Sequence, residues 1–174
     1  PTPRSSSAAS DVYKRQTYLN TNGWINFRMR AMIMSFASYN LWQPWQKTSP
    51  LLAELFTDFE PGIHISQVQM QSGVTGINLP RIYSVFKQSL DQDSTAEWTK
   101  KMIPQLENVE IELIHNAELK DIYYDQIVDP KLSAKKARDT IWAMRKNSDF
   151  KKIAREVYLK HGSRKKQQFN RVSI

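Results

Sequence analysis

The chain has 174 residues and a formal net charge of +8, with 40% apolar and 24% charged residues, which are ordinary values for a globular domain. Cysteine is absent, so disulfides, thiolate zinc sites and cysteine-bound iron–sulfur clusters are excluded within this chain. No apolar run approaches the ~20 residues that a transmembrane helix needs, and we expect a cytoplasmic protein with no membrane partner.

The positive charge is concentrated at the C-terminal end. Residues 151–174 contain eight Lys or Arg and one acidic residue, whereas residues 17–150 contain 14 basic and 15 acidic residues. Such a tail can contact DNA phosphates, through Arg164, Lys165 and Lys166. A solvated tail that aids solubility explains the charge equally well. The basicity therefore does not by itself indicate nucleic-acid binding.

Composition divides the chain into three parts. Residues 1–16 are Ser-rich and end in DVYKRQ, which reads like a translated sequencing adaptor, so we interpret them as an adaptor-derived or disordered leader. On this interpretation the natural gene is truncated at or before Thr17. Residues 17–161 carry the helical patterns and form a partial domain. Residues 162–174 are the basic tail, which we predict to be disordered.

The first predicted helix spans residues 22–40. Apolar side chains recur at helical spacing and cover nearly all of its faces, a pattern typical of a helix buried in a sizeable protein. Arg28 and Arg30 interrupt this pattern. Because an unpaired buried charge is very costly, these arginines require anionic partners.

The secondary-structure pattern is less clear in the middle of the chain. Ser49 and Pro50 are predicted to open a second helix, as its N-cap and first-turn residue. Residues 58–76 alternate like a strand between turn-rich ends, but a short helix or irregular segment is favoured because no second strand offers itself. Residues 105–116 also alternate, and we predict coil or a short extended piece there.

A short helix is predicted after residue 93. Asp93 or Ser94 caps it, and it runs through Ile103 to a stop at Pro104. Residues 117–123 are predicted to form another helical turn or two.

Two further helices are predicted before the tail. Ser133 is the predicted cap of the first, in which Ile141, Trp142 and Met144 are expected to be buried. Ser148 is the predicted cap of the second. The predicted fold class is therefore all-α, with no complete sheet.

Generic site motifs are missing. The five glycines form no phosphate-binding loop, and no GxSxG elbow is present. The three histidines, His64, His115 and His161, are far apart, so we expect no metal site.

A polar stretch follows the second predicted helix. Asp58, Glu60 and His64 precede three glutamines at alternate positions. A solvated loop is the simpler interpretation. The alternative is that Arg28 or Arg30 pairs with Asp58 inside a cofactor cavity, because such cavities combine apolar walls with a few placed polar groups.

Several ordered segments resemble DNA photolyases and cryptochromes. GWINFRMRAMIMSFASYNLWQPW is similar to the family segment in which an arginine-bearing helix leads to a loop ending in tryptophan. FTDFEPGIHISQVQMQSGVTG resembles the flavin-contacting stretch with spaced acids. RIYSVFKQSLDQDSTAEWTKKMIPQL and IVDPKLSAKKARDTIWAMRK resemble the segments that follow it. The likeness covers residues 23–146.

The resemblance implies the C-terminal part of a helical FAD-binding domain. Arg30 matches the arginine that pairs with an acid beside the isoalloxazine ring, and Asp58 matches that acid. Glu60 matches the second acid, which accepts from the flavin N3–H. His64 falls near the position that faces flavin N5. A cation near a reduced anionic flavin and a carboxylate facing N3–H are physically sensible, since they stabilise the charge and orient the ring.

The implied activity is that of a deoxyribodipyrimidine photo-lyase, in which excited FAD donates an electron to a pyrimidine dimer flipped out of damaged DNA. Trp45 matches the middle tryptophan of the electron-transfer chain. Val68 stands where the flavin-proximal tryptophan is expected, and Met70 stands where an aromatic residue contacts the lesion. Trp42 or Trp24 offers another route, although core packing is the simpler interpretation of both.

Two alternatives to repair stay open. The first is a cryptochrome-like blue-light photoreceptor without repair activity, and the second is a degenerate relative that binds flavin or nucleic acid without photochemistry. An antenna pigment, folate or deazaflavin, is expected only in an N-terminal domain that this chain lacks. The fragment itself is expected to be inactive, and the full-length protein to be a monomer.

Overall fold

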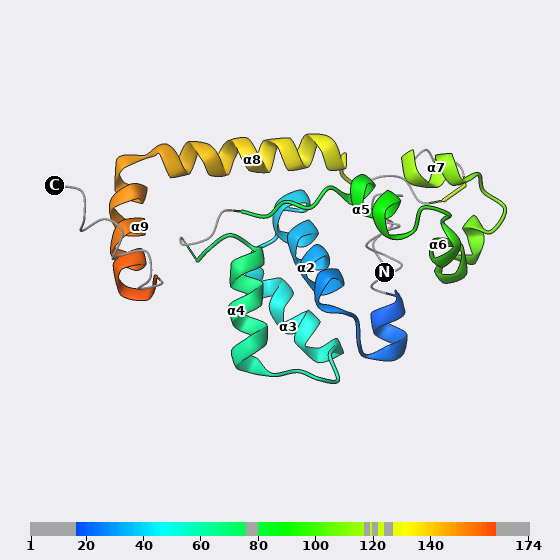
Figure 1. Ribbon diagram of the computed structural model, residues 1–174, viewed down its shortest axis with the longest axis horizontal. Helices are drawn as coiled ribbons and strands as arrows, with labels where there is room; N and C mark the ends of the chain where they lie inside the picture. Colours follow the sequence, from blue (N-terminus) through cyan, green and yellow to red (C-terminus); the bar gives the residue numbers. More distant parts are fainter. Residues whose placement is uncertain (1–16, 76–79, 117–118, 120–121, 124–126, 163–174) are drawn as a thin grey trace, which may run out of the picture.

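The computed structural model describes residues 17–75, 80–116, 119, 122–123 and 127–162. Within these residues the regular structure is entirely helical and contains no strand, which confirms the all-α class. Residues 17–22 are helical, and they are followed by α2 (Phe27–Ser35), the π-helical turn η1 (Phe36–Asn40), α3 (Trp45–Leu55), α4 (Pro61–Gln71), α5 (Val85–Gln92), α6 (Glu97–Met102), the 3₁₀ turn η2 (Pro104–Leu106), α7 (Ile111–Asn116), α8 (Pro130–Lys146) and α9 (Ser148–His161) (Figure 1).

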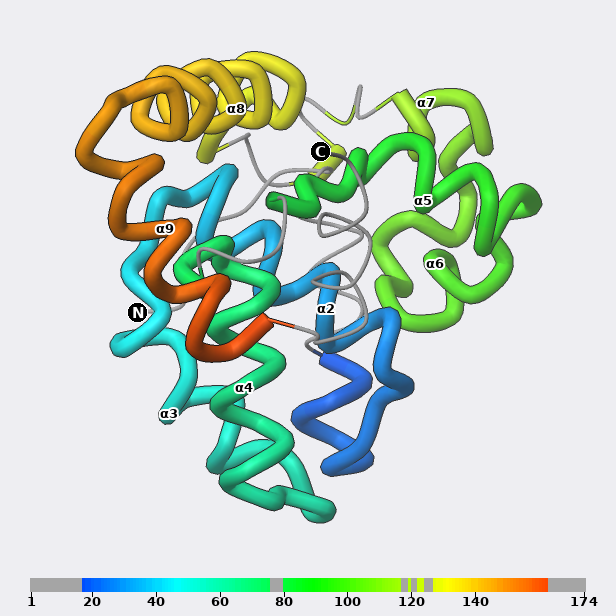
Figure 2. Tube along the Cα trace, turned by 60° about the vertical axis from the view of Figure 1, so that its left-hand side comes forward, coloured from blue at the N-terminus to red at the C-terminus, as the bar shows by residue number. Residues whose placement is uncertain are grey.

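Helices α2, α3 and α4 pack around the first apolar cluster. The buried members of this cluster come from all three helices and the segments before and between them: Leu19, Ile25, Ile33, Met34, Leu52, Phe56 and Val68. Figure 2 shows α3 and α4 side by side, with α2 on the other side of α4. Burial of these side chains is the main term that holds the three helices together.

A second apolar cluster lies under α6, η2 and α7. Its buried members are Ala96, Ile103, Leu106, Ile114 and Leu119. Tyr18 and Trp98 connect this part to the N-terminal helical segment, with ring centroids 5.9 Å apart in an edge-to-face arrangement. Figure 1 shows this part at the opposite end of the molecule from α9.

Helix α8 is anchored on the π-helical turn. The side-chain amide of Asn40 donates to the backbone carbonyl of Pro130 at 3.1 Å and to the hydroxyl of Ser133 at 2.9 Å. Beyond this contact α8 extends away from α2, and α9 turns back from its far end (Figure 1).

The first helix is shorter than predicted. It begins at Phe27 because the side chain of Asn26 accepts a hydrogen bond from the Met29 amide at 3.0 Å and so caps it. Trp24 and Phe27 are 50% and 56% exposed, whereas the residues from Ala31 to Phe36 are buried. The expectation of a helix buried on nearly all faces therefore holds only for its second half.

Two predicted helix starts were one turn late. Helix α3 begins at Trp45, directly after Pro44, so Ser49 and Pro50 lie inside the helix. Helix α8 begins at Pro130, because the Asp129 side chain accepts from the amides at positions 131 and 132. Ser133 is an interior residue whose hydroxyl donates to the Asp129 carbonyl at 2.6 Å.

Other boundaries differ by less. Helix α9 is capped by Asn147 and not by Ser148, which is its first residue. The cap of α6 was predicted correctly in part: Asp93 accepts from the Trp98 and Thr99 amides, although the helix begins only at Glu97.

The prediction of coil or an extended piece over residues 105–116 was wrong, because α7 is a helix. Alternation in this segment suggested a strand, but the buried side chains are the consecutive Ile114 and His115. A strand would need a neighbour for its backbone hydrogen bonds, and a helix satisfies them within the segment.

Burial on α8 was also predicted incorrectly. Trp142 and Met144 are 43% and 58% exposed, Ile141 is half-buried, and Ala137 is fully buried. The short helix favoured within residues 58–76 is confirmed as α4. Of the predicted turns over residues 117–123, positions 117–118 and 120–121 lie outside the described residues, and the Ile122 and Tyr123 amides donate to the Leu119 carbonyl.

Candidate functional site

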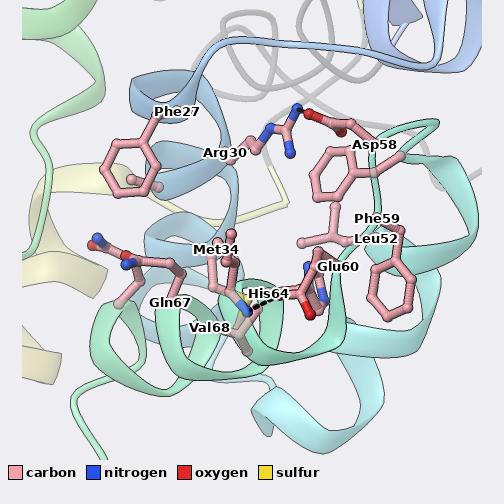
Figure 3. A pocket seen from close by; sticks show the side chains of 14 residues that line it. Phe27, Arg30, Met34, Leu52, Asp58, Phe59, Glu60, His64, Gln67 and Val68 are labelled. Carbon is pink, nitrogen blue, oxygen red and sulfur yellow. Dashed lines mark hydrogen bonds and ion pairs between the residues drawn. The ribbon is translucent and has the colours of Figure 1, made fainter.

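A pocket of about 140 Å³ opens between α2, α3, α4 and the loop that joins α3 to α4 (Figure 3). Its walls are mainly apolar, and a few polar groups stand among them. It is lined by Phe27, Arg30, Ala31, Met34, Leu52, Phe56, Asp58, Phe59, Glu60, Ile63, His64, Gln67, Val68 and Gln71. Apolar walls with few polar groups are typical of a site for a small organic ligand or cofactor.

Arg30 is held at the edge of this pocket by three different contacts. Its Nε donates to the backbone carbonyl of Ile25 at 2.8 Å, and a terminal nitrogen lies 2.9 Å from both carboxylate oxygens of Asp58. The guanidinium carbon lies 4.2 Å from the centre of the Phe56 ring, a geometry that adds a cation–π attraction. The side chain is therefore fixed with its charge beside the pocket.

Asp58 is the anionic partner expected for one of the two arginines of α2. The hydrogen bond from Arg30 is the main reason that the pKa of this carboxyl lies below its usual value of 3.8. Partial desolvation opposes this effect, and the positive charge of Arg30 adds to it. The Asp58 side chain is 48% exposed, so solvent weakens the pair while leaving the carboxylate ionised at neutral pH.

Glu60 begins α4. Its Oε2 accepts from the Ile63 amide at 2.7 Å, and Pro61 occupies the first helical position. This is a standard helix start, with a carboxylate at the positive end of the helix dipole. The other carboxylate oxygen, Oε1, has no hydrogen bond recorded among the described residues.

His64 is buried on the pocket side of α4. Its Nε2 lies 3.1 Å from the Ser49 carbonyl and 3.0 Å from the Ser49 hydroxyl. Donation from Nε2 to this carbonyl requires the tautomer with its proton on Nε2, which leaves Nδ1 as an acceptor, whereas the hydroxyl can pair with either tautomer. The rings of Phe56 and Phe59 meet the imidazole edge-on, at 5.8 and 5.3 Å.

The structure brings together four of the predicted site residues, Arg30, Asp58, Glu60 and His64, on one pocket (Figure 3). Val68 belongs to the same lining and is 5% exposed.

The other predicted residues lie elsewhere. Trp45 packs partly buried against the first apolar cluster and lines a second pocket. Met70 lies half-buried on α4 and is not among the residues that line the first pocket. The tail residues Arg164, Lys165 and Lys166 lie outside the described part of the chain.

Some residues of the site were not predicted. Ser49 was interpreted as a helix cap, although it contacts His64. Gln67 and Gln71 were seen only as part of a polar stretch, and both line the pocket. The helical period of α4 is the signal that could have found them, since positions 64, 67, 68 and 71 share one helix face.

Two other site types find no support in the described residues. Among them, no group of three or more His, Cys, Asp or Glu side chains is arranged to hold a metal ion. Within the same part of the chain, every helix is too short or too polar to cross a membrane.

Comparison with known proteins gives a consistent result. A family model described as the FAD binding domain of DNA photolyase matches residues 15–143, well over half of the chain. The deoxyribodipyrimidine photo-lyase of Buchnera aphidicola subsp. Baizongia pistaciae is 31% identical over 96 residues, which cover 54% of this chain and 20% of that protein. The chain thus spans about a fifth of the length of this curated relative.

A solved structure shows the same fold. The crystal structure of an archaeal photolyase from Sulfolobus tokodaii, which contains two FAD molecules, matches with a TM-score of 0.69. The sequence identity is 21%, and the match covers 75% of this chain and 31% of that chain.

Proposed function

Since the chain belongs to the family of DNA photolyase FAD-binding domains, we propose that it is part of a light-dependent DNA repair flavoprotein that acts on pyrimidine dimers. The observation that carries this proposal is the Arg30–Asp58 ion pair together with the Glu60 carboxylate at one apolar pocket. These three groups are the ones that the resemblance assigns to the flavin ring.

The pocket fits part of FAD. Its volume of about 140 Å³ is below the ~300–1,000 Å³ of pockets that enclose a whole drug-sized ligand, so it suits one edge of the isoalloxazine ring. Its lining includes buried side-chain amide atoms of Gln67 and Gln71 that have no hydrogen-bond partner. A ring edge with donors and acceptors would satisfy them.

Each polar residue of the pocket can make a particular electrostatic or hydrogen-bonding interaction with such a ring. Arg30 supplies a fixed positive charge, which would stabilise negative charge on a reduced ring. Glu60 Oε1 can accept from an imide N–H while Oε2 keeps the helix cap. In the tautomer whose Nε2 donates to the Ser49 carbonyl, His64 can accept at Nδ1.

FAD, when bound, supplies the light-absorbing ring and the electron for repair. The flipped dimer would accept this electron, split into two pyrimidines and return the electron, so that no net oxidation or reduction occurs.

A cryptochrome-like photoreceptor without repair activity is the second candidate function. Met70 favours it, because this residue stands where an aromatic residue would contact the lesion and it does not line the pocket. Val68, which stands where the flavin-proximal tryptophan is expected, weakens both functions.

The test measures FAD binding and repair with a full-length protein that contains this chain, because the chain spans only about a fifth of its curated relative. We expect FAD binding, seen as quenched flavin fluorescence, and recovery of absorbance near 260 nm when the reduced complex and dimer-containing DNA are illuminated. Arg30→Ala should weaken FAD binding by at least ~10-fold, since it removes a charge-assisted hydrogen bond. Arg28→Ala, at an exposed arginine of the same helix, is the matched control and should leave binding unchanged.

The outcomes separate the two functions. FAD binding and photoreduction without recovered absorbance would favour the photoreceptor. Failure of the full-length protein to bind FAD at any concentration would contradict both.

A further inference from the structure

Gln71 presents a buried amide group with no partner. The residue is 2% exposed, and neither its Nε2 nor its Oε1 makes a hydrogen bond. The Oε1 of Gln67, one turn earlier on α4, is buried and unpartnered in the same way. Both residues line the pocket that also contains Arg30 and Glu60.

Buried polar groups without a hydrogen-bond partner are rare because they are energetically costly. Nearly all buried polar atoms in native proteins are hydrogen-bonded, because an unmade bond leaves the full cost of removing the group from water. Other buried polar atoms of the described residues, such as the hydroxyls of Ser38, Tyr39 and Thr75, also lack a partner. Gln67 and Gln71, four positions apart on one helix face, are the residues of this group that line the pocket. Their common neighbour is the pocket, which indicates that their partner is a molecule bound there.

We propose that Gln71, assisted by Gln67, hydrogen-bonds a polar edge of the flavin ring that occupies this pocket. The inference rests on the proposed function, because it takes its ligand from there. It adds two binding side chains to Arg30, Asp58 and Glu60, which the resemblance already assigned.

The chemistry of the amide matches that ligand. A glutamine amide both donates and accepts, and the pyrimidine edge of a flavin alternates carbonyl oxygens with an imide N–H. The terminal torsion of glutamine is broad, so the amide can turn toward the pocket without leaving its rotamer. A purely apolar ligand could not satisfy these atoms, and a carboxylate could use only their N–H groups.

The test uses Gln71→Met in the same full-length protein. Methionine has nearly the same length and flexibility but no hydrogen-bonding amide. Gln69→Met is the matched control, because Gln69 lies on the same helix, is half-buried and does not line the pocket. Urea unfolding without ligand gives stability, and titration with FAD gives the dissociation constant.

We expect the two measurements to move in opposite directions. Without FAD, Gln71→Met should raise the urea midpoint by roughly 0.5–1 M, since it removes an unsatisfied buried amide. It should also weaken FAD binding by about 10-fold, since the ring loses one or two hydrogen bonds. Gln69→Met should change neither quantity appreciably.

Three results would overturn the inference. A lower urea midpoint for Gln71→Met would mean that the amide has a structural partner. Unchanged FAD affinity, with clear binding by the wild type, would remove Gln71 from the ring while leaving the proposed function intact. No FAD binding by the wild type would reject the proposed function, and this inference with it.

Discussion

Arg30 shows how single residues prepare the site. Its side chain is tied to a backbone carbonyl, a carboxylate and an aromatic face at once. A free arginine loses rotamer entropy when it meets a ligand, and here most of that loss accompanies folding. The cation is therefore in position before a ligand arrives.

Asp58 should make stability depend on acidity. Because its pKa in the folded chain lies below the usual 3.8, the stabilisation from the Arg30 pair is present above that pH and lost as the pH falls through the folded pKa. We expect the difference in urea midpoint between the wild type and Asp58→Asn to shrink as the pH falls from 6 to 3. The effect should be small and should weaken with added salt, since the pair is exposed.

The control for this measurement is Asp139→Asn, at an exposed carboxyl on α8. It should follow the wild-type curve. A difference between the wild type and Asp58→Asn that stays constant over the whole pH range would contradict the assignment.

Tyr39 should give a separate response in alkali. Burial raises its pKa from 10.0 to about 12, so the unfolded chain loses this proton first as the pH rises, and stability falls between about pH 10 and 12. Its hydroxyl is buried without a hydrogen-bond partner. We expect Tyr39→Phe to increase the free energy of unfolding by about 1 kcal/mol at pH 7 and to remove this alkaline decline.

Urea titrations at pH 7, 10 and 11 test this expectation. Tyr83→Phe, at a half-buried tyrosine, should retain the decline. A Tyr39→Phe variant less stable than the wild type at pH 7 would indicate that the hydroxyl has a partner.

At the scale of elements, the sequence predicted which segments are helical better than where they begin. Helix α8 illustrates the cause, because Asp129, Ser133 and the proline between them all favour a helix start. Sequence rules for helix caps cannot tell which of two favourable cap residues, four positions apart, begins the helix. The choice falls on Asp129, because Asn40 uses the Ser133 hydroxyl as an acceptor, and that contact joins residues 93 positions apart.

The cap of α8 can be measured directly. Asp129→Ala removes the acceptor of two amides and should lower the free energy of unfolding by about 1 kcal/mol. Ser148→Ala, at the predicted but incorrect cap of α9, should change it by less than about 0.5 kcal/mol. Urea unfolding measures the change in both variants. Equal losses of unfolding free energy would contradict the assignment of Asp129 as the cap of α8.

The sequence predicted the part of the site that depends on charge, because a buried arginine requires an anionic partner. Both arginines of the apolar helix were expected to be buried and to need acids, and Arg30 does pair with Asp58. The expectation was wrong for Arg28, which is exposed. The role of Gln71 was hidden, because the three alternating glutamines look alike until α4 places two of them toward the pocket and one away. The Ser49–His64 contact was hidden for the same reason, since it depends on how α3 packs against α4.

At the scale of the molecule, the described residues contain two separate large apolar clusters, and the pocket belongs to only one of them. Cluster members from α6, η2 and α7 do not line it. The part of the chain around α2, α3 and α4 therefore carries the proposed chemistry, and the second cluster lies outside it.

The floor of the pocket is also the centre of the first cluster. Met34, Leu52, Phe56 and Val68 line the cavity and pack the three helices against one another. Any exchange that reshapes the cavity, such as a large aromatic ring at position 68, must also rebuild the close packing beneath it. Evolution or engineering can thus alter ligand preference here only by small coordinated replacements.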